Sequence, residues 1–98
     1  MAIELIAEVR ADFGKQKMKK LRALNRLPAN MYGGPLPAPR AITLDLHQTE
    51  LLLKANGGKA DYRVVLEGRS YPVTIKEART EPIYRHLLHL DFLVHTDA

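Results

Sequence analysis

The sequence predicts an α+β fold that is mostly β: a small six-stranded β-barrel, closed or strongly curled, with about two helices. Three features support this prediction. Short segments alternate between apolar and polar residues, glycine and proline separate these segments, and two stretches are rich in strong helix formers. The chain has 98 residues, 46 % of them hydrophobic and 27 % charged. We therefore expect residues 1–98 to form a single domain with one core.

The first third of the chain contains two expected strands with an expected helix between them. Residues 3–10 alternate with period two, which is typical of a half-buried strand. Residues 15–25 are strong helix formers, and Pro28 ends the helix because the residue before a proline is driven out of the α region. Residues 29–32 form a short strand, and the proline-rich segment 35–39 is expected to be an extended loop.

The middle of the chain predicts a third strand and a second helix. Residues 41–46 resume the strict alternation of a strand. Residues 48–55 follow as a helix, which we expect to end at Asn56-Gly57-Gly58 because glycine favours the conformation that terminates helices.

The last third predicts a hairpin and a final strand. Residues 62–67 and 70–75 flank Gly68-Arg69, which is suited to a two-residue turn. Pro72 lacks an N–H group, so we expect its strand to lie at an edge or its backbone nitrogen to face solvent. Residues 89–94 read as the last strand.

Positive charge is concentrated in one part of the chain. Between Arg10 and Arg26 there are seven basic residues and a single acidic one, Asp12, although the net charge of the whole chain is only +4. Such a concentration creates a field that attracts polyanions. A lysine-rich helix face that is simply solvated is the alternative interpretation.

The spacing of these charges favours a binding surface. At about 100° per residue, four basic side chains of the expected helix fall within about 60° of one another. This basic stripe consists of Lys15, Lys19, Arg22 and Arg26. Met18, Leu21 and Leu24 occupy a different face, on which the helix can pack. A stripe without acidic residues is suited to phosphate contacts, which release counterions. Tyr32, beyond the helix, could stack on a nucleotide or bond to it.

The histidines near the C-terminus raise a second possibility. His86, His89, Asp91 and His95 carry groups that zinc can use. His89 and Asp91, however, are expected to lie on a strand, and no HExxH pattern occurs. Alternation places His89 and Asp91 on one face and Leu90 and Phe92 on the other. We therefore expect a polar contact or an RNA-binding surface there rather than a metal site.

Several functional classes are not supported. The chain has no cysteine, so disulfides, thiolate metal sites and cysteine nucleophiles are excluded. It lacks a phosphate-binding glycine loop, a nucleophile elbow and any run long and apolar enough for a membrane helix. We expect a cytoplasmic protein that is not an enzyme, with no cofactor, no small-molecule substrate and no membrane partner.

Several separated motifs, in the same order and spacing, resemble one known family. They are AEVR at 7–10, GK at 14–15, LRALNRLPANMYGG at 21–34, AITLDL at 41–46, VVLEGRSYPVTIKEAR at 64–79 and HLDF at 89–92. The chain is similar to the bacterial large-subunit ribosomal protein family numbered twenty-five, which is related to a general stress protein. The resemblance covers nearly the whole chain.

This resemblance implies a fold and a function. The family folds as a small β-barrel with adjacent helices and binds the irregular internal-loop helix of 5S ribosomal RNA from its widened minor groove. Within the large ribosomal subunit, neighbouring ribosomal proteins are further candidate partners. The RNA contacts that the resemblance implies are Arg10, Lys15, Lys19, Arg22, Tyr32, Lys76, His89 and Asp91.

The sequence also departs from the family pattern. Thr80 stands where a basic residue is frequent, and we include the neighbouring Arg79 among the expected RNA contacts. Lys19 stands where arginine is common, which replaces a bidentate donor by a point charge. The chain stops soon after residue 94, so it resembles the single-domain form of the family.

Two other functions stay open. A stress-protective or protein-interaction module could use the same barrel without depending on the ribosome. A metal-dependent hydrolase would use His86, His89 and Asp91. The basic residues and the HLD sequence favour RNA binding, because a barrel does not need them for packing.

Overall fold

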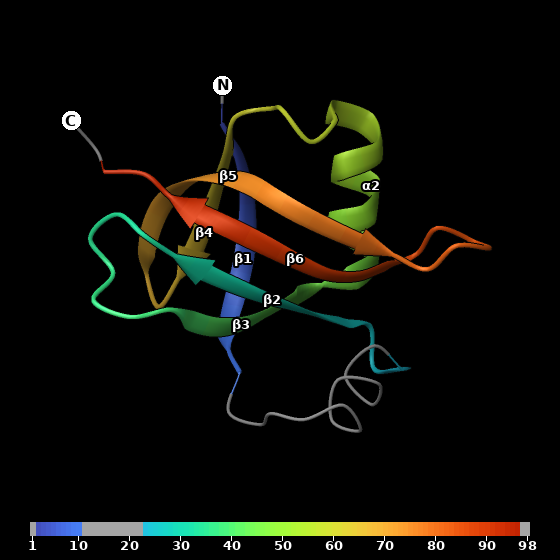
Figure 1. Cartoon of the computed structure of the whole chain (residues 1–98), viewed down its shortest axis with the longest axis horizontal. Coiled ribbons are helices and arrows are strands. Elements are labelled where there is room, and N and C mark those ends of the chain that lie inside the picture. Colours follow the sequence, from blue (N-terminus) through green and yellow to red (C-terminus); the bar gives the residue numbers. More distant parts are fainter. Residues whose placement is uncertain (1, 11–22, 97–98) are drawn as a thin grey trace.

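The computed structural model describes residues 2–10 and 23–96, which form a closed six-stranded barrel (Figure 1). Its strands are β1 (Ile3–Val9), β2 (Arg26–Tyr32), β3 (Arg40–Asp45), β4 (Tyr62–Leu66), β5 (Arg69–Thr80) and β6 (Leu87–Val94), and its helix is α2 (Leu46–Asn56). The strand order around the barrel is β1-β3-β2-β6-β5-β4. The predicted fold, mostly β with a closed six-stranded barrel, is confirmed.

The barrel closes through two parallel strand pairs. β1 pairs with β4 and β2 pairs with β6 in parallel, whereas the other four neighbouring pairs are antiparallel. β2 and β6 run side by side across the face seen in Figure 1. This pairing has a functional consequence, because it places Asn30 opposite Asp91 although they lie far apart in the chain.

Alternation along each strand fills the interior of the barrel. On β6, Leu90, Phe92 and Val94 are buried while His89 and Asp91 lie on the outer side, as predicted. On β2, Leu27 and Met31 are fully buried. A barrel of this strand number is filled by side chains rather than forming a channel, so polar chemistry is confined to its outer surface and ends.

Helix α2 covers one end of the barrel and has local start and stop signals. The Asp45 side chain caps its N-terminus by accepting a hydrogen bond from the Gln48 N–H at 2.8 Å. Gly57, with φ of 81°, ends the helix and donates its N–H to the Leu53 carbonyl at 2.7 Å. Leu52 and Leu53 pack against the core. The second predicted helix is confirmed, and no helix in the described part of the chain is long and apolar enough to cross a membrane.

A glycine pair carries the chain out of β2 in tight contact with the end of β6. Gly33 and Gly34 have φ of 90° and 56°. A Cβ at Gly33 would lie 2.7 Å from Cδ1 of Leu93, and one at Gly34 would lie 3.0 Å from the carbonyl oxygen of Val94. Only glycine tolerates both the backbone conformation and this approach.

Most of the predicted first helix, residues 15–25, lies outside the described residues, and two details at its end differ from the prediction. Residues 11–22 lie outside the described residues, and with them Lys15, Lys19 and Arg22. Arg26 is the first residue of β2 and pairs with Asp45, so its predicted place on the basic stripe of the helix is wrong. Leu24 is 65 % exposed, so its predicted packing on the barrel is also wrong.

The reason is the β2–β3 ladder. Asn25 adopts a positive φ of 63°, and its carbonyl and side-chain oxygens accept hydrogen bonds from the Leu46 and His47 N–H groups. Strand pairing therefore begins before Pro28, which lies inside β2 opposite Thr43. Long-range pairing with β3 thus places Arg26 in a strand.

The position of the turn in the hairpin prediction is also wrong. Leu66 pairs with Arg69, so the turn residues are Glu67 and Gly68, with φ of 51° and 80°, rather than Gly68 and Arg69. A turn with two positive φ values matches the twist of the strands, and it accepts glycine in the second place. Of the two alternatives predicted for Pro72, the edge strand is excluded, because β5 lies between β4 and β6.

Candidate nucleic-acid interface

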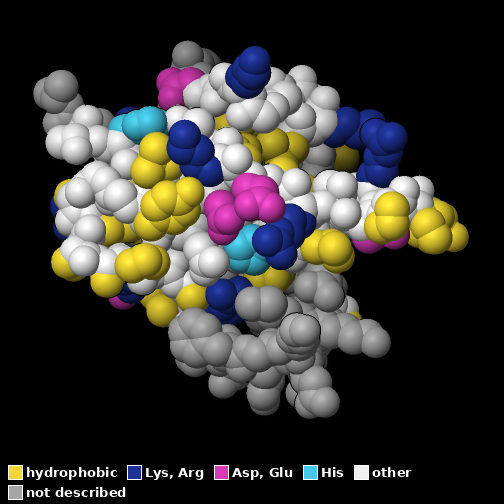
Figure 2. Space-filling view, viewed as in Figure 1, with side chains coloured by type: hydrophobic (Ala, Val, Ile, Leu, Met, Phe, Trp, Pro, Cys, Tyr) yellow, Lys and Arg dark blue, Asp and Glu magenta, His cyan; other side chains and the backbone are white. Residues whose placement is uncertain are grey.

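Polar side chains from neighbouring strands meet on the outer surface of the barrel. The strand register places Asp91 between Asn30 of β2 and Glu77 of β5, and His89 opposite Arg79. Figure 2 shows acidic, histidine and basic side chains next to one another near the middle of this face. The cluster therefore offers hydrogen-bond donors and acceptors of both charges.

A chain of contacts connects the end of β1 to β6. Nη2 of Arg10 donates to Oδ1 of Asn30 at 3.3 Å, and Nδ2 of Asn30 lies 3.3 Å from Nε2 of His89. His89 Nδ1 in turn lies 3.4 Å from Oδ1 of Asp91. We call Arg10, Asn30, His89 and Asp91 the polar relay. It holds side chains of three elements in a defined geometry.

The geometry of the relay favours one tautomer of the neutral His89 ring. A guanidinium only donates, so the Asn30 oxygen must face Arg10 and the Asn30 amide nitrogen must face His89. Nε2 of His89 is then an acceptor, and the ring proton is on Nδ1, beside Asp91. A proton on Nε2 would point at the N–H groups of Asn30 and repel them.

Burial of the ring lowers the pKa of His89 below its usual value. The negative charges of Asp91 and Glu77 raise this pKa, while the positive charges of Arg10 and Arg79 lower it further.

This lowered pKa predicts a pH dependence of stability. As the pH falls below about 6.5, the unfolded chain takes up a proton at His89 that the folded protein resists, so the free energy of unfolding decreases. We expect it to fall more steeply from pH 7 to pH 5 in the unmodified protein than in His89→Gln. Urea denaturation at both pH values measures this difference. Equal losses in the two proteins would contradict the prediction.

A β-bulge sets the direction of the β5 side chains. Ile75 pairs with Phe92 and Glu77 pairs with Asp91, so Lys76 is an extra residue in β5. Beyond the bulge, Glu77 and Arg79 line up with the outward-facing residues of β6, and Arg79 Nε donates to Glu77 Oε1 at 3.0 Å. Lys76 is exposed beside them.

Tyr32 and Arg40 extend this surface toward the β2–β3 loop. They line a shallow cavity of about 380 Å³ together with Asn30 and Asp91. The half-buried tyrosine thus lies beside the polar relay, where a flat ring can contact a nucleotide.

Arg26 is held away from the polar relay. Its Nη2 donates to Oγ1 of Thr43 at 3.0 Å and lies 3.7 Å from a carboxylate oxygen of Glu8. These contacts connect β2, β3 and β1 across the outside of the barrel. Its predicted role in RNA binding stays a prediction.

The structure thus gathers six of the ten predicted contact residues around one surface. They are Arg10, Tyr32, Lys76, Arg79, His89 and Asp91. Sequence reasoning missed Asn30 and Arg40. Asn30 lies two residues before Tyr32 on the expected strand, so the alternation contained a signal that it shares the outer face.

The histidines predicted as alternative metal ligands are dispersed. His86 Nδ1 lies 3.3 Å from Oε2 of Glu50 on α2, and His95 contacts the hydroxyl of Thr74. Within residues 2–10 and 23–96, no group of three His, Asp or Glu side chains is arranged to hold a metal ion.

Comparison with known proteins places this surface in a family context. Three similar proteins, each named large ribosomal subunit protein bL25, come from Bifidobacterium longum subsp. infantis, Leifsonia xyli subsp. xyli and Thermomicrobium roseum. The first two are 32 % and 35 % identical over 91 residues, which is 93 % of this chain and 42 % and 44 % of theirs. The third is 34 % identical over 85 residues, 87 % of this chain and 38 % of its own.

The chain therefore spans less than half the length of these relatives. The sequence pattern of the Ribosomal L25p family matches residues 5–92, which include strands β2 to β5, most of β1 and β6, helix α2 and every residue of the polar relay. The chain belongs to the ribosomal L25p family.

Proposed function

We propose that this chain is a non-catalytic component of the bacterial large ribosomal subunit, acting in the cytoplasm as a domain that binds 5S rRNA. Membership of a ribosomal protein family supports the assignment to the large ribosomal subunit. The motif resemblance supports 5S rRNA as the RNA that is bound. The proposed RNA contacts are the polar relay with Tyr32, Lys76 and Arg79, together with Lys15, Lys19 and Arg22 of the predicted basic stripe.

The observation that carries the proposal is the polar relay. Its side chains are held by one another on rigid strands, so they present a fixed pattern of donors and acceptors. A widened minor groove displays 2′-hydroxyl groups, base acceptors and the guanine amino group. The Asp91 carboxylate can accept from an amino group or a 2′-hydroxyl, which explains an acidic residue on an RNA-binding surface.

Phosphate contacts supply the affinity in this proposal. Arg10, Lys76 and Arg79 are offset locally by Asp91 and Glu77, so the described surface is mixed in charge. The basic stripe at Lys15, Lys19 and Arg22 adds positive charge without nearby acids. Phosphate contacts position the protein, and groove contacts select the RNA.

A titration of 5S rRNA tests the proposal and the basic stripe together. We expect Lys19→Ala and Arg22→Ala each to weaken binding and to lower the salt-dependence slope by about one unit at most. Lys59→Ala removes an exposed charge from the α2–β4 connection and is the matched control. An RNA with a mutated internal loop should compete poorly. Unchanged affinity and slope in both stripe variants would exclude the stripe, and equal competition by the mutated RNA would exclude the proposed target.

A further inference from the structure

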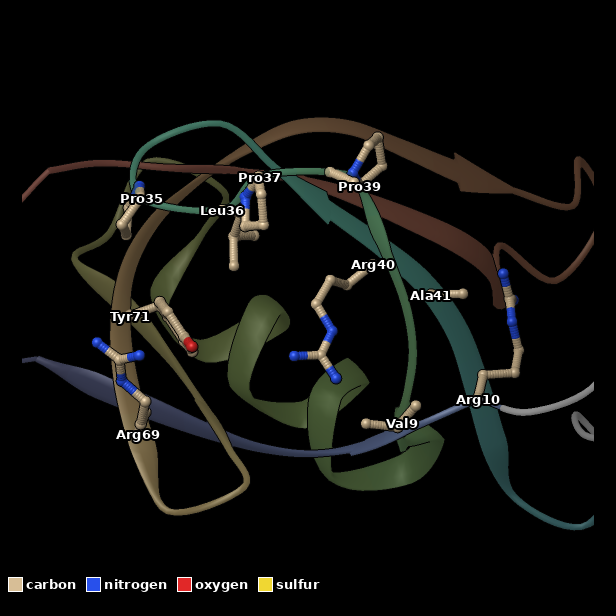
Figure 3. A pocket seen from close by; sticks show the side chains of 11 residues that line it. Val9, Arg10, Pro35, Leu36, Pro37, Pro39, Arg40, Ala41, Arg69 and Tyr71 are labelled. Carbon is tan, nitrogen blue, oxygen red and sulfur yellow. The ribbon is translucent and has the colours of Figure 1, made fainter.

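A second cavity, of about 490 Å³, lies at the end of the barrel opposite α2 (Figure 3). It is at the start of β3, whereas α2 follows the end of β3. The β2–β3 loop forms one wall through Pro35, Leu36 and Pro37, and Tyr71 of β5 lies on another side. Its volume is in the range of ligand pockets.

The charge of this cavity is one-sided. Three of the residues that line it are arginines, Arg10, Arg40 and Arg69, and none is acidic. The remaining lining is apolar or aromatic. A cavity that combines guanidinium groups with flat apolar walls suits a ligand that has both phosphate and ring surfaces.

Arg40 extends into the middle of the cavity in Figure 3. Its Nη2 lies 2.8 Å from Oε1 of Glu67, and both side chains reach solvent, with exposures of 35 % and 60 %. An exposed ion pair of this kind contributes little to stability. A phosphate can therefore displace Glu67 at small cost.

Arg69 and Tyr71 form the opposite side of the cavity. The Arg69 guanidinium carbon lies 5.6 Å from the centroid of the Tyr71 ring, which restrains a side chain that is otherwise exposed. The guanidinium is thus held beside an aromatic surface.

The cavity adjoins the proposed RNA surface. Pro39, Arg40 and Ala41 line both this cavity and the shallow one that contains Tyr32, Asn30 and Asp91. Arg10 also lines this cavity and donates to Asn30 of the polar relay. A strand of RNA that leaves the polar relay toward the β2–β3 loop would reach Arg40 and then Arg69.

We infer that this cavity holds one unstacked nucleotide of the bound RNA, with its base against the Pro35–Pro37 wall and Tyr71 and its phosphates on Arg40 and Arg69. The inference rests on the proposed RNA-binding function. The inference adds a binding site for a single nucleotide, separate from the contacts that the polar relay makes with the RNA minor groove. Aromatic and apolar surfaces accept an unstacked base of any identity.

Charge-neutralising variants test the inference in the same 5S rRNA titration. Arg40→Gln and Arg69→Gln should each weaken binding about three- to tenfold and lower the salt slope by about one. Glu67→Gln should strengthen binding, because Arg40 loses a competing carboxylate. If the Arg40–Glu67 pair only stabilised the fold, Arg40→Gln and Glu67→Gln would both weaken RNA binding. Lys59→Gln is the matched charge control.

Cross-linking identifies the occupant. RNA that carries 4-thiouridine should form adducts with Tyr71 or with the 35–37 wall in the unmodified protein. Tight RNA binding with no effect of the three variants, and cross-links only elsewhere, would overturn the inference while leaving the proposed function intact. Failure of the unmodified protein to bind 5S rRNA would overturn both.

Discussion

Asn30→Leu is expected to weaken binding of 5S rRNA by about 30-fold. Leucine keeps the size of the side chain but removes the hydrogen bond from Arg10 and the contact with His89. The Arg10–Asn30 bond is already present in the free protein, so its loss weakens binding by misplacing Arg10 and His89. We expect this to cost one charge-assisted contact with the RNA, about 2 kcal/mol, which corresponds to a 30-fold change in affinity. The titration against 5S rRNA measures the effect.

Two further variants separate positioning from a general loss of structure. Asn56→Leu makes the same exchange at an exposed site on α2, and its RNA affinity should not change. Asn30→Asp keeps an acceptor for Arg10 but replaces the N–H groups that face His89 with an oxygen. We therefore expect the pKa of His89 to rise in Asn30→Asp, which NMR titration of the ring protons can follow. An unchanged pKa would contradict the proposed arrangement of the polar relay.

Phe92→Ala is expected to cause the largest loss of stability. Phe92 is 0 % exposed and lies in the core on the strand that also carries His89 and Asp91. Truncating a buried phenylalanine costs about 3–5 kcal/mol, and a native domain has only about 5–15 kcal/mol of stability. Urea denaturation at neutral pH gives the free energy of unfolding.

Ile83→Ala is the control for this prediction. Ile83 is 77 % exposed in the connection between β5 and β6, so its truncation should change stability by less than about 0.5 kcal/mol. A loss in Phe92→Ala no larger than that of the control would contradict the assignment of Phe92 to the core.

Local sequence patterns predicted the parts of this fold that depend on near neighbours. Strict alternation identified the buried and outer faces of β6, and the Asn56-Gly57-Gly58 signal located the end of α2. Both features follow from periods of two and 3.6 residues and from glycine's backbone freedom. The start of β2 was not predictable in this way, because Arg26 joins a ladder with Asp45, which lies on another strand.

The residues of the candidate site also divide into those that the local sequence predicted and those that only strand pairing brought together. Alternation placed His89 and Asp91 on one outer face, and residue type indicated their hydrogen-bonding chemistry. Asn30 joins them only through the parallel pairing of β2 with β6. The direction of Glu77 and Arg79 depends on the bulge at Lys76, which a period-two pattern does not reveal.

The sequence by itself determined the class of fold, the inward face of β6, the second helix and the family resemblance, because each of these is expressed in local pattern or in ordered motifs. Only the tertiary structure decided the register of the closed barrel, the protonation of His89 and the cavity shared by Arg10, Arg40 and Arg69. These features arise where strands distant in the chain pair with one another. The physical reason is that the pairing register of each strand depends on the strands on both sides of it, so in a closed barrel all six registers are fixed together.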